Sequence, residues 1–183
     1  SKVSAHLNIP MEQVFYKGKP VVLEGGAIDV NGKGTLITSE ECLLDPKIQV
    51  RNPGFTREDY EAIFNDYLGV TNTIWLGDGI KGDDTHGHID DLARFVNEDT
   101  IVTVVESDKK SPNYAALQDN LKRLEGAVLE NGKKPNIVQL PMPQQIDFDG
   151  VVLPASYANF LILNKAVLVP TFNDSRDREA LNI

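Results

Sequence analysis

The chain has 183 residues, of which 41% are hydrophobic and 25% are charged, and its formal net charge is −9. This composition is typical of a globular protein, and the length is sufficient for a single domain with a substantial core. No run of Lys and Arg exceeds two residues. That argues against nucleic acid and anionic membranes as partners, because both favour basic patches. The acidic balance mildly favours a cationic ligand, although most surface charge serves only solubility.

The cysteine content and the hydropathy suggest a cytoplasmic protein. A single cysteine, Cys42, excludes an internal disulfide and fits a reducing compartment. No apolar segment approaches the ~20 residues of a membrane span. Residues 1–10 lack the apolar core of a signal peptide.

The N-terminal half is predicted to form strands and one long helix. Residues 20–26 are expected to form a short apolar strand. Residues 27–40 are expected to form a hairpin that turns at an Asn-Gly pair, since both residues tolerate the positive φ of such turns. Residues 51–70 have the apolar spacing of a helix that begins after Thr56 and ends at Gly69.

A buried strand at residues 71–79 leads into an acidic segment, and the C-terminal half then repeats the pattern. Two paired strands, a helix, a strand and a final hairpin are expected in this order: 91–96 and 100–107, a helix from Ser111 or Asn113 to Asn131–Gly132, 136–143, and 156–164 with 165–172.

This order predicts an α/β fold in which strands followed by a helix recur at a spacing of roughly 60 to 70 residues. No linker or shift in composition divides the chain, so residues 1–183 are interpreted as one domain. A dinucleotide-binding Rossmann fold is excluded, because the glycine-rich residues 25–34 open a hairpin where that fold requires a helix.

The acidic segment at residues 82–91, GDDTHGHIDD, contains four carboxylates and two of the three histidines. Its H-x-H-x-D pattern, formed by His86, His88 and Asp90, resembles that of two-metal hydrolases. Such sites need further histidines, and only His6 remains, so we expect neither a metal nor a cofactor. The alternatives are a metal-free cluster that binds a cation and transfers protons, and a solvated loop with incidental histidines.

Three longer segments carry a resemblance to a known family: LEGGAIDVNGKGTLITSEECLL, IWLGDGIKGDDTHGHIDDLARFV and LPASYANFLILNKAVLVPTFND. With these segments, from about Pro20 to the C-terminus, the chain resembles the agmatine deiminases, which are related to the bacterial peptidyl-arginine deiminases. The segments occur in the order typical of the family. The resemblance implies a pentein-type α/β propeller built from repeated ββαβ modules, of which this chain would form about half.

The resemblance implies roles for three residues. His88 matches the general acid and base of the family, Asp90 matches a carboxylate that holds the guanidinium of the substrate, and Glu24 matches the carboxylate that orients the histidine. His86 and Asp91 match no such role, and we expect them to support the site at most. No cofactor or metal is implied, and the expected partner is a small guanidino compound.

These roles are chemically coherent. A guanidinium is planar, and carboxylates accept its N–H groups in pairs. If residues 86–90 form a strand, alternation places His88 and Asp90 on one face, and His86 with them. A carboxylate beside the imidazole favours the protonated ring and fixes its orientation. The glycine pair after Glu24 allows close approach of the backbone.

Two expected parts of the catalytic machinery are absent from the sequence. The family attacks the guanidinium carbon with a cysteine in a glycine-rich segment near its C-terminus, and a second guanidinium-binding Asp would precede Ser1. Cys42 lies in an expected surface helix at residues 38–44 and aligns with a family position outside the active site. Residues 173–183 are predicted to begin a helix. We therefore expect an internal fragment of a longer deiminase that is inactive by itself.

Three functions are consistent with the sequence. The first is an agmatine deiminase that forms N-carbamoylputrescine and ammonia, a step toward putrescine. The second is a deiminase of peptidyl-arginine or another guanidino compound. The third is a non-catalytic pentein that binds a partner, and the presence of Glu24, His88 and Asp90 argues against it. A homodimer of the full-length protein is left open.

Overall fold

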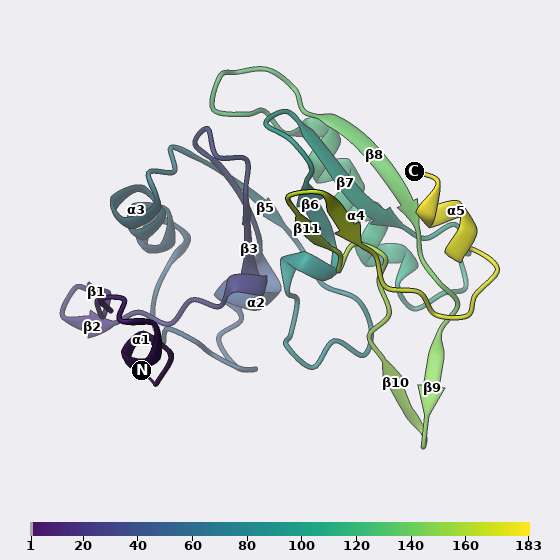
Figure 1. Cartoon of the computed structure of the whole chain (residues 1–183), viewed down its shortest axis with the longest axis horizontal. Coiled ribbons are helices and arrows are strands. Elements are labelled where there is room, and N and C mark those ends of the chain that lie inside the picture. The colour runs from purple at the N-terminus through teal and green to yellow at the C-terminus, as the bar shows by residue number, and fades with distance from the viewer. Residues whose placement is uncertain (1) are drawn as a thin grey trace.

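The computed structural model describes residues 2–183, and its centre consists of two α/β units that lie side by side (Figure 1). The first unit is a three-stranded sheet of β3 (Ile28–Val30), β4 (Thr35–Ser39) and β5 (Asn72–Leu76). β3 pairs with β4 in antiparallel fashion, and β4 pairs with β5 in parallel. The parallel pair requires a crossover, which contains helix α3 (Arg57–Leu68).

The second unit repeats this order. β6 (Ala93–Phe95) pairs with β7 (Thr100–Val105) in antiparallel fashion, and β7 pairs with β8 (Asn136–Pro141) in parallel. Helix α4 (Tyr114–Gly126) makes the crossover and packs against both β5 and β7. β3 and β6, the first strands of the two units, contact each other. The predicted α/β class is confirmed, and each unit has the ββαβ order.

The ends of the crossover helices follow from local chemistry. Thr56 and Asp59 form a capping box at the start of α3, and Gly69 ends the helix with a φ of 68°, as predicted. Helix α4 begins after Asn113, one of the two predicted starts, but it ends at Gly126 and not at Asn131–Gly132. The backbone becomes extended at Ala127, and Leu129 is buried in the core within a separate turn.

The predicted strand at residues 20–26 is wrong. Only β2 (Lys19–Pro20) is a strand there, and it pairs with β1 (Phe15–Tyr16) in a hairpin that the sequence did not predict. The side chain of Asn52 satisfies the backbone of Val22, accepting from its N–H at 2.8 Å and donating to its carbonyl at 2.7 Å. An amide side chain therefore takes the place of a partner strand.

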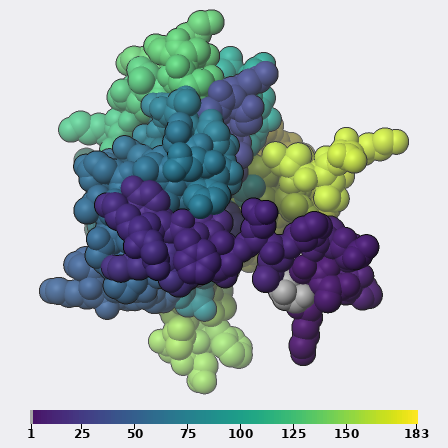
Figure 2. All heavy atoms as spheres, turned by 90° about the vertical axis from the view of Figure 1, so that its left-hand side faces the viewer, coloured from purple at the N-terminus to yellow at the C-terminus, as the bar shows by residue number. Residues whose placement is uncertain are grey.

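Three further elements lie at the periphery. Helix α1 (Lys2–Leu7) was not predicted, and neither was the antiparallel hairpin of β9 (Ile146–Phe148) and β10 (Val151–Leu153). This hairpin projects from the body of the molecule in both views (Figures 1 and 2). The N-terminal segment crosses the face of the molecule that is seen in Figure 2.

The predicted C-terminal hairpin is present but shorter than expected. It consists of β11 (Leu161–Leu163) and β12 (Ala166–Leu168), and most of its apolar side chains are exposed. Helix α5 (Asp177–Leu181) follows, with Arg176 as its N-cap residue. The sheets of the described residues are separate and do not close into a ring, so a propeller is not established by them.

Two groups of buried side chains hold the units together. The larger one spans both sheets and α4, with Ile37, Leu76 and Ile101 among its fully buried members. The smaller one lies under α3, where Tyr60 and Phe64 pack against other aromatic rings. Across residues 2–183, no helix combines the length and the apolarity that a membrane span requires.

Candidate active site

The candidate site lies where the two units meet. Each unit begins with a short 3-10 helix, η1 (Gly25–Ala27) before β3 and η2 (Ile89–Asp91) before β6, and these two turns contact each other. In each unit a buried threonine of the second strand, Thr38 or Thr103, donates to a backbone carbonyl at the end of the turn, at 2.8 and 3.0 Å. The same local design thus positions both halves of the site.

The three predicted site residues are brought together. His88 Nε2 lies 2.8 Å from Glu24 Oε2, and His88 Nδ1 lies 3.9 Å from Asp90 Oδ1. The imidazole therefore has a carboxylate on each side. Its side chain is 12% exposed, which leaves one edge of the ring accessible. A ring held in this way can exchange protons with a bound molecule.

The path of the chain through the acidic segment differs from the prediction. Residues 86–90 are not a strand, because His86 and Gly87 have positive φ values of 62° and 80° and His88 is the N-cap residue of η2. His86 consequently does not share a face with His88. It turns toward the carboxylates of Asp45 at 2.9 Å and Glu41 at 3.2 Å.

This divergence also bears on the metal alternative. The two histidines of the H-x-H-x-D pattern point to different carboxylates and do not converge on one point. A different set of donor atoms, from Glu24, Cys42 and His88, lies within 4.8 Å of one another. The guanidinium of Arg51 is already bonded to Glu24, and a metal cation there would be repelled. The residues therefore do not fit a metal.

Cys42 is the residue whose place was predicted wrongly. Residues Glu40–Leu44 do form a short helix, α2, but Cys42 is 2% exposed and lies against the site and not on the surface. Burial raises the pKa of its thiol to about 11, and Arg51 opposes this only in part. A buried thiol that keeps its proton is a poor nucleophile.

The carboxylate of Asp83 organises the loop that carries His88, a role that was not predicted from the sequence. Asp83 Oδ2 accepts from the backbone N–H groups of Gly87 and His88 at 2.8 and 3.0 Å, and Oδ1 accepts from that of Thr85 at 2.8 Å. An Asp two residues before Thr in a glycine-rich loop is typical of such turns, and this was the available signal.

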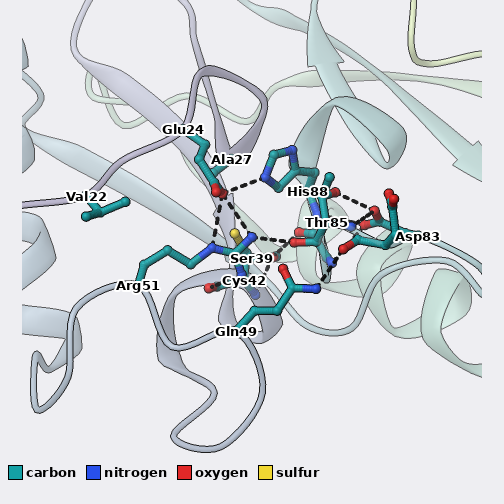
Figure 3. A network of polar contacts seen from close by, with 12 residues as sticks. Val22, Glu24, Ala27, Ser39, Cys42, Gln49, Arg51, Asp83, Thr85 and His88 are labelled. Atoms are coloured by element: carbon teal, nitrogen blue, oxygen red, sulfur yellow. Dashed lines mark hydrogen bonds and ion pairs between the residues drawn. The ribbon is translucent and has the colours of Figure 1, made fainter.

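Arg51 was missed as well, and no periodic pattern marks it. Its side chain is 5% exposed, and it reaches Glu24 Oε2 with Nε at 3.0 Å and Nη2 at 2.9 Å. Figure 3 shows Glu24 lying between the Arg51 guanidinium and the His88 ring. Burial acts to raise the pKa of Glu24, but the bonds from His88 and Arg51 outweigh it and hold that pKa below its ordinary value.

A cavity of about 320 Å³ opens on the other side of His88. Burial raises the pKa of Asp90, and it raises the pKa of Asp91 to about 6 although Asn159 donates to Asp91 at 3.0 Å. Four of the lining residues are aspartates. The lining residues are Asp83, Asp84, Thr85, His88, Asp90, Asp91, Pro154, Ser156, Asn159, Pro170 and Phe172.

The chain is similar to proteins of known family. The sequence profile of the Porphyromonas-type peptidyl-arginine deiminases matches residues 1–183. A provisionally named agmatine deiminase from Marinomonas sp. (strain MWYL1) is 37% identical, with 90% of this chain and 48% of that protein covered. One from Legionella pneumophila (strain Paris) is 35% identical, with 99% of this chain and 51% of that protein covered.

Solved structures agree with these sequence relatives. A cysteine-to-serine variant of the C. jejuni agmatine deiminase, with substrate bound, has a TM-score of 0.86 and 32% identity, and the match covers 99% of this chain and 51% of that one. The agmatine deiminase of Enterococcus faecalis has a TM-score of 0.83 and 34% identity, with 99% and 52% covered.

Our chain spans about half the length of the curated relatives that it matches. The match to the family profile nevertheless extends over its whole length. The chain belongs to the Porphyromonas-type peptidyl-arginine deiminase family.

Proposed function

We propose that the full-length protein is an agmatine deiminase, which hydrolyses the guanidinium of agmatine to N-carbamoylputrescine and ammonia. His88 acts as general acid and base, Glu24 orients it, and Asp90 binds the guanidinium. A cysteine outside residues 1–183 serves as the nucleophile and forms an amidino intermediate. We also propose that the ββαβ units belong to a pentein propeller, and that residues 1–183 are part of that single domain.

The observation that carries this proposal is the different setting of the two carboxylates beside His88. Glu24 is bonded to Arg51, whereas Asp90 lines the acidic cavity and has no cation in hydrogen-bond contact within the described part of the chain. A guanidinium that enters the cavity would supply the missing positive charge and donate N–H groups in pairs. Four aspartates among the lining residues favour a cation there.

The proposed steps balance in atoms and protons. The cysteine thiolate adds to the guanidinium carbon, and His88 gives its proton to the departing nitrogen, which leaves as ammonia. His88, now neutral, takes a proton from water as the water oxygen attacks the amidino carbon. The carbon–sulfur bond then breaks, which restores the thiolate and releases the ureido product. The remaining proton leaves with ammonia as ammonium.

Burial of the site supports this use of His88. A proton relay works when the ring is held in one orientation and one edge stays accessible. The Glu24 contact at 2.8 Å fixes the ring, and the cavity lies along its other side. Two residues of the sequence-based assignment, His86 and Asp91, have no step in this mechanism.

The test is product formation by the full-length parent. We expect ammonium and N-carbamoylputrescine from agmatine, with a higher kcat/KM than for free arginine or an arginine peptide, and full activity in EDTA. A preference for the peptide would make the substrate assignment wrong and leave the chemistry intact. Absence of ammonia from all three compounds would refute the deiminase, and activity that EDTA removes and zinc restores would favour a metal hydrolase.

A further inference from the structure

Arg51 is a buried cation that belongs to neither the cavity nor the surface. A guanidinium that is 5% exposed is costly unless it is paired and its donors are satisfied. Here each nitrogen has an acceptor: Nε and Nη2 reach Glu24, Nη1 donates to the carbonyl of Cys42 at 3.3 Å, and Nη2 also donates to that of Thr85. Four of the five N–H donors therefore have an acceptor, which indicates a fixed position.

The contacts of Arg51 join three separate segments at the site. Glu24 precedes η1, Cys42 lies in α2, and Thr85 belongs to the loop that carries His88 (Figure 3). Gln49, two residues before Arg51, adds a bond of 2.6 Å to the carbonyl of Asp84 in the same loop. The segment around Arg51 therefore fastens the His88 loop against the Glu24 segment.

The choice of oxygen atom is informative. The Nε and Nη2 atoms of Arg51 and the Nε2 atom of His88 contact the same atom, Glu24 Oε2. Arg51 thus fixes the carboxylate oxygen that fixes the imidazole. It also supplies Glu24 with a guanidinium of its own, which leaves Asp90 as the carboxylate beside His88 that is open to a substrate guanidinium.

We propose that Arg51 is a positioning residue of the active site, which keeps Glu24 aimed at His88 and reserves Asp90 for the substrate. This inference rests on the proposed deiminase function only for its effect on turnover. A substrate-binding role is excluded by the geometry, because Arg51 does not line the cavity as residues 2–183 define it, and a cation would repel a guanidinium.

The charge surroundings of Glu24 give the proposal a readout that needs no turnover. The ionisable groups that face Glu24 are Arg51, His88 and the thiol of Cys42. Removal of Arg51 leaves the burial that raises the pKa of Glu24 and takes away one of the two groups that lower it. The pKa of Glu24 should therefore rise when Arg51 is removed.

The experiment compares Arg51→Met and Arg51→Lys with the parent in the full-length protein. Arg57→Met serves as the control, because Arg57 pairs with Glu40 away from the site. The Glu24 carboxyl signal, labelled with ¹³C and assigned by its loss in Glu24→Gln, is titrated in each protein. We expect the Glu24 pKa to rise in Arg51→Met, to rise less in Arg51→Lys, which keeps the charge, and to stay unchanged in Arg57→Met.

Kinetics supply the second readout. We expect kcat for agmatine to fall about 100-fold in Arg51→Met, since misplacement by about 1 Å can have that effect, with KM within about twofold of the parent. Arg51→Lys should recover part of kcat. An unmoved Glu24 pKa in Arg51→Met, or a raised KM with unchanged kcat, would overturn the proposal. If Arg51→Met does not fold, an Arg51→Lys protein with the parent's titration and the parent's kcat would overturn it. If the parent has no deiminase activity, the titration of Glu24 in Arg51→Met alone decides whether Arg51 positions Glu24.

Discussion

The two sides of His88 differ in how their negative charge is compensated. On the paired side, which comprises Glu24 and Arg51, a carboxylate with a lowered pKa is bonded to a buried guanidinium. On the open side, which comprises Asp90 and Asp91, burial raises the pKa of both carboxyls, and they line a cavity of about 320 Å³. Among residues 2–183, Glu24 already has a guanidinium partner, whereas neither Asp90 nor Asp91 is hydrogen-bonded to a Lys or Arg side chain. This contrast assigns the orientation of the His88 ring to Glu24 and the binding of the substrate guanidinium to Asp90.

His88→Ala removes the group between the two sides and should have the largest effect on turnover. General acid and base catalysis typically contributes about 10²–10⁴-fold to the rate, so kcat of the full-length parent should fall by that factor. Agmatine binding, measured by calorimetry in a variant without the nucleophile, should change little. Near-normal turnover in His88→Ala together with loss of turnover in His86→Ala would mean that His86, and not His88, transfers the protons.

Asp90→Asn tests the open side. The amide keeps the shape of the carboxyl, removes its charge and places donors opposite the donors of the substrate. Loss of one partner of a buried charge pair costs on the order of 2–5 kcal/mol, so agmatine affinity should fall by a corresponding factor in calorimetry. An unchanged affinity in Asp90→Asn would mean that the guanidinium binds elsewhere.

The glycine pair after Glu24 offers a matched test of the spacing between the two sides. A Cβ on Gly26 would lie 2.5 Å from His88 Nδ1 and 2.7 Å from Asp90 Oδ2, whereas one on Gly25 would meet nothing within 4 Å. Gly26→Ala must therefore displace both side chains, and kcat/KM should fall about 10- to 100-fold. Gly25→Ala should stay within about twofold of the parent. Equal kinetics for the two variants would contradict the close approach at Gly26.

Asp91→Asn should reveal the stability that the open side loses through its uncompensated charge. The folded pKa of Asp91 is raised to about 6, so the folded state binds more protons than the unfolded state between about pH 4 and pH 6, and stability declines as pH rises through this window. Removing the charge should raise Tm by roughly 2–8 °C at pH 7.5. The gain should vanish near pH 3.5, and a gain that is the same at both pH values would contradict the assignment.

The sequence predicted best what is local or contiguous. The β3–β4 hairpin and the capping of α3 lie in short segments whose chemistry can be read directly. Glu24, His88 and Asp90 were selected by the resemblance to the family, and the structure places their side chains together. The direction of His86 could not be read, because two consecutive positive φ values replace the strand that alternation assumes.

Residues that act through a distant carboxylate or backbone group were not predictable in the same way. Arg51 lies in an irregular loop, and its role depends on contacts with Glu24 and Thr85 that only the tertiary structure creates. Asp83 binds backbone N–H groups of its own loop, and its sequence signal was one acid among four in the segment. Burial of Cys42 likewise follows from how α2 packs and not from its composition.

The most direct test of the contrast between the two sides is a crystal structure of the full-length protein with agmatine, with the nucleophilic cysteine changed to serine. The account predicts the guanidinium in the cavity, with its N–H groups donating to Asp90 and its carbon next to the His88 ring, while Arg51 remains bonded to Glu24. A guanidinium bonded to Glu24 in place of Arg51, or bound outside the cavity, would contradict it.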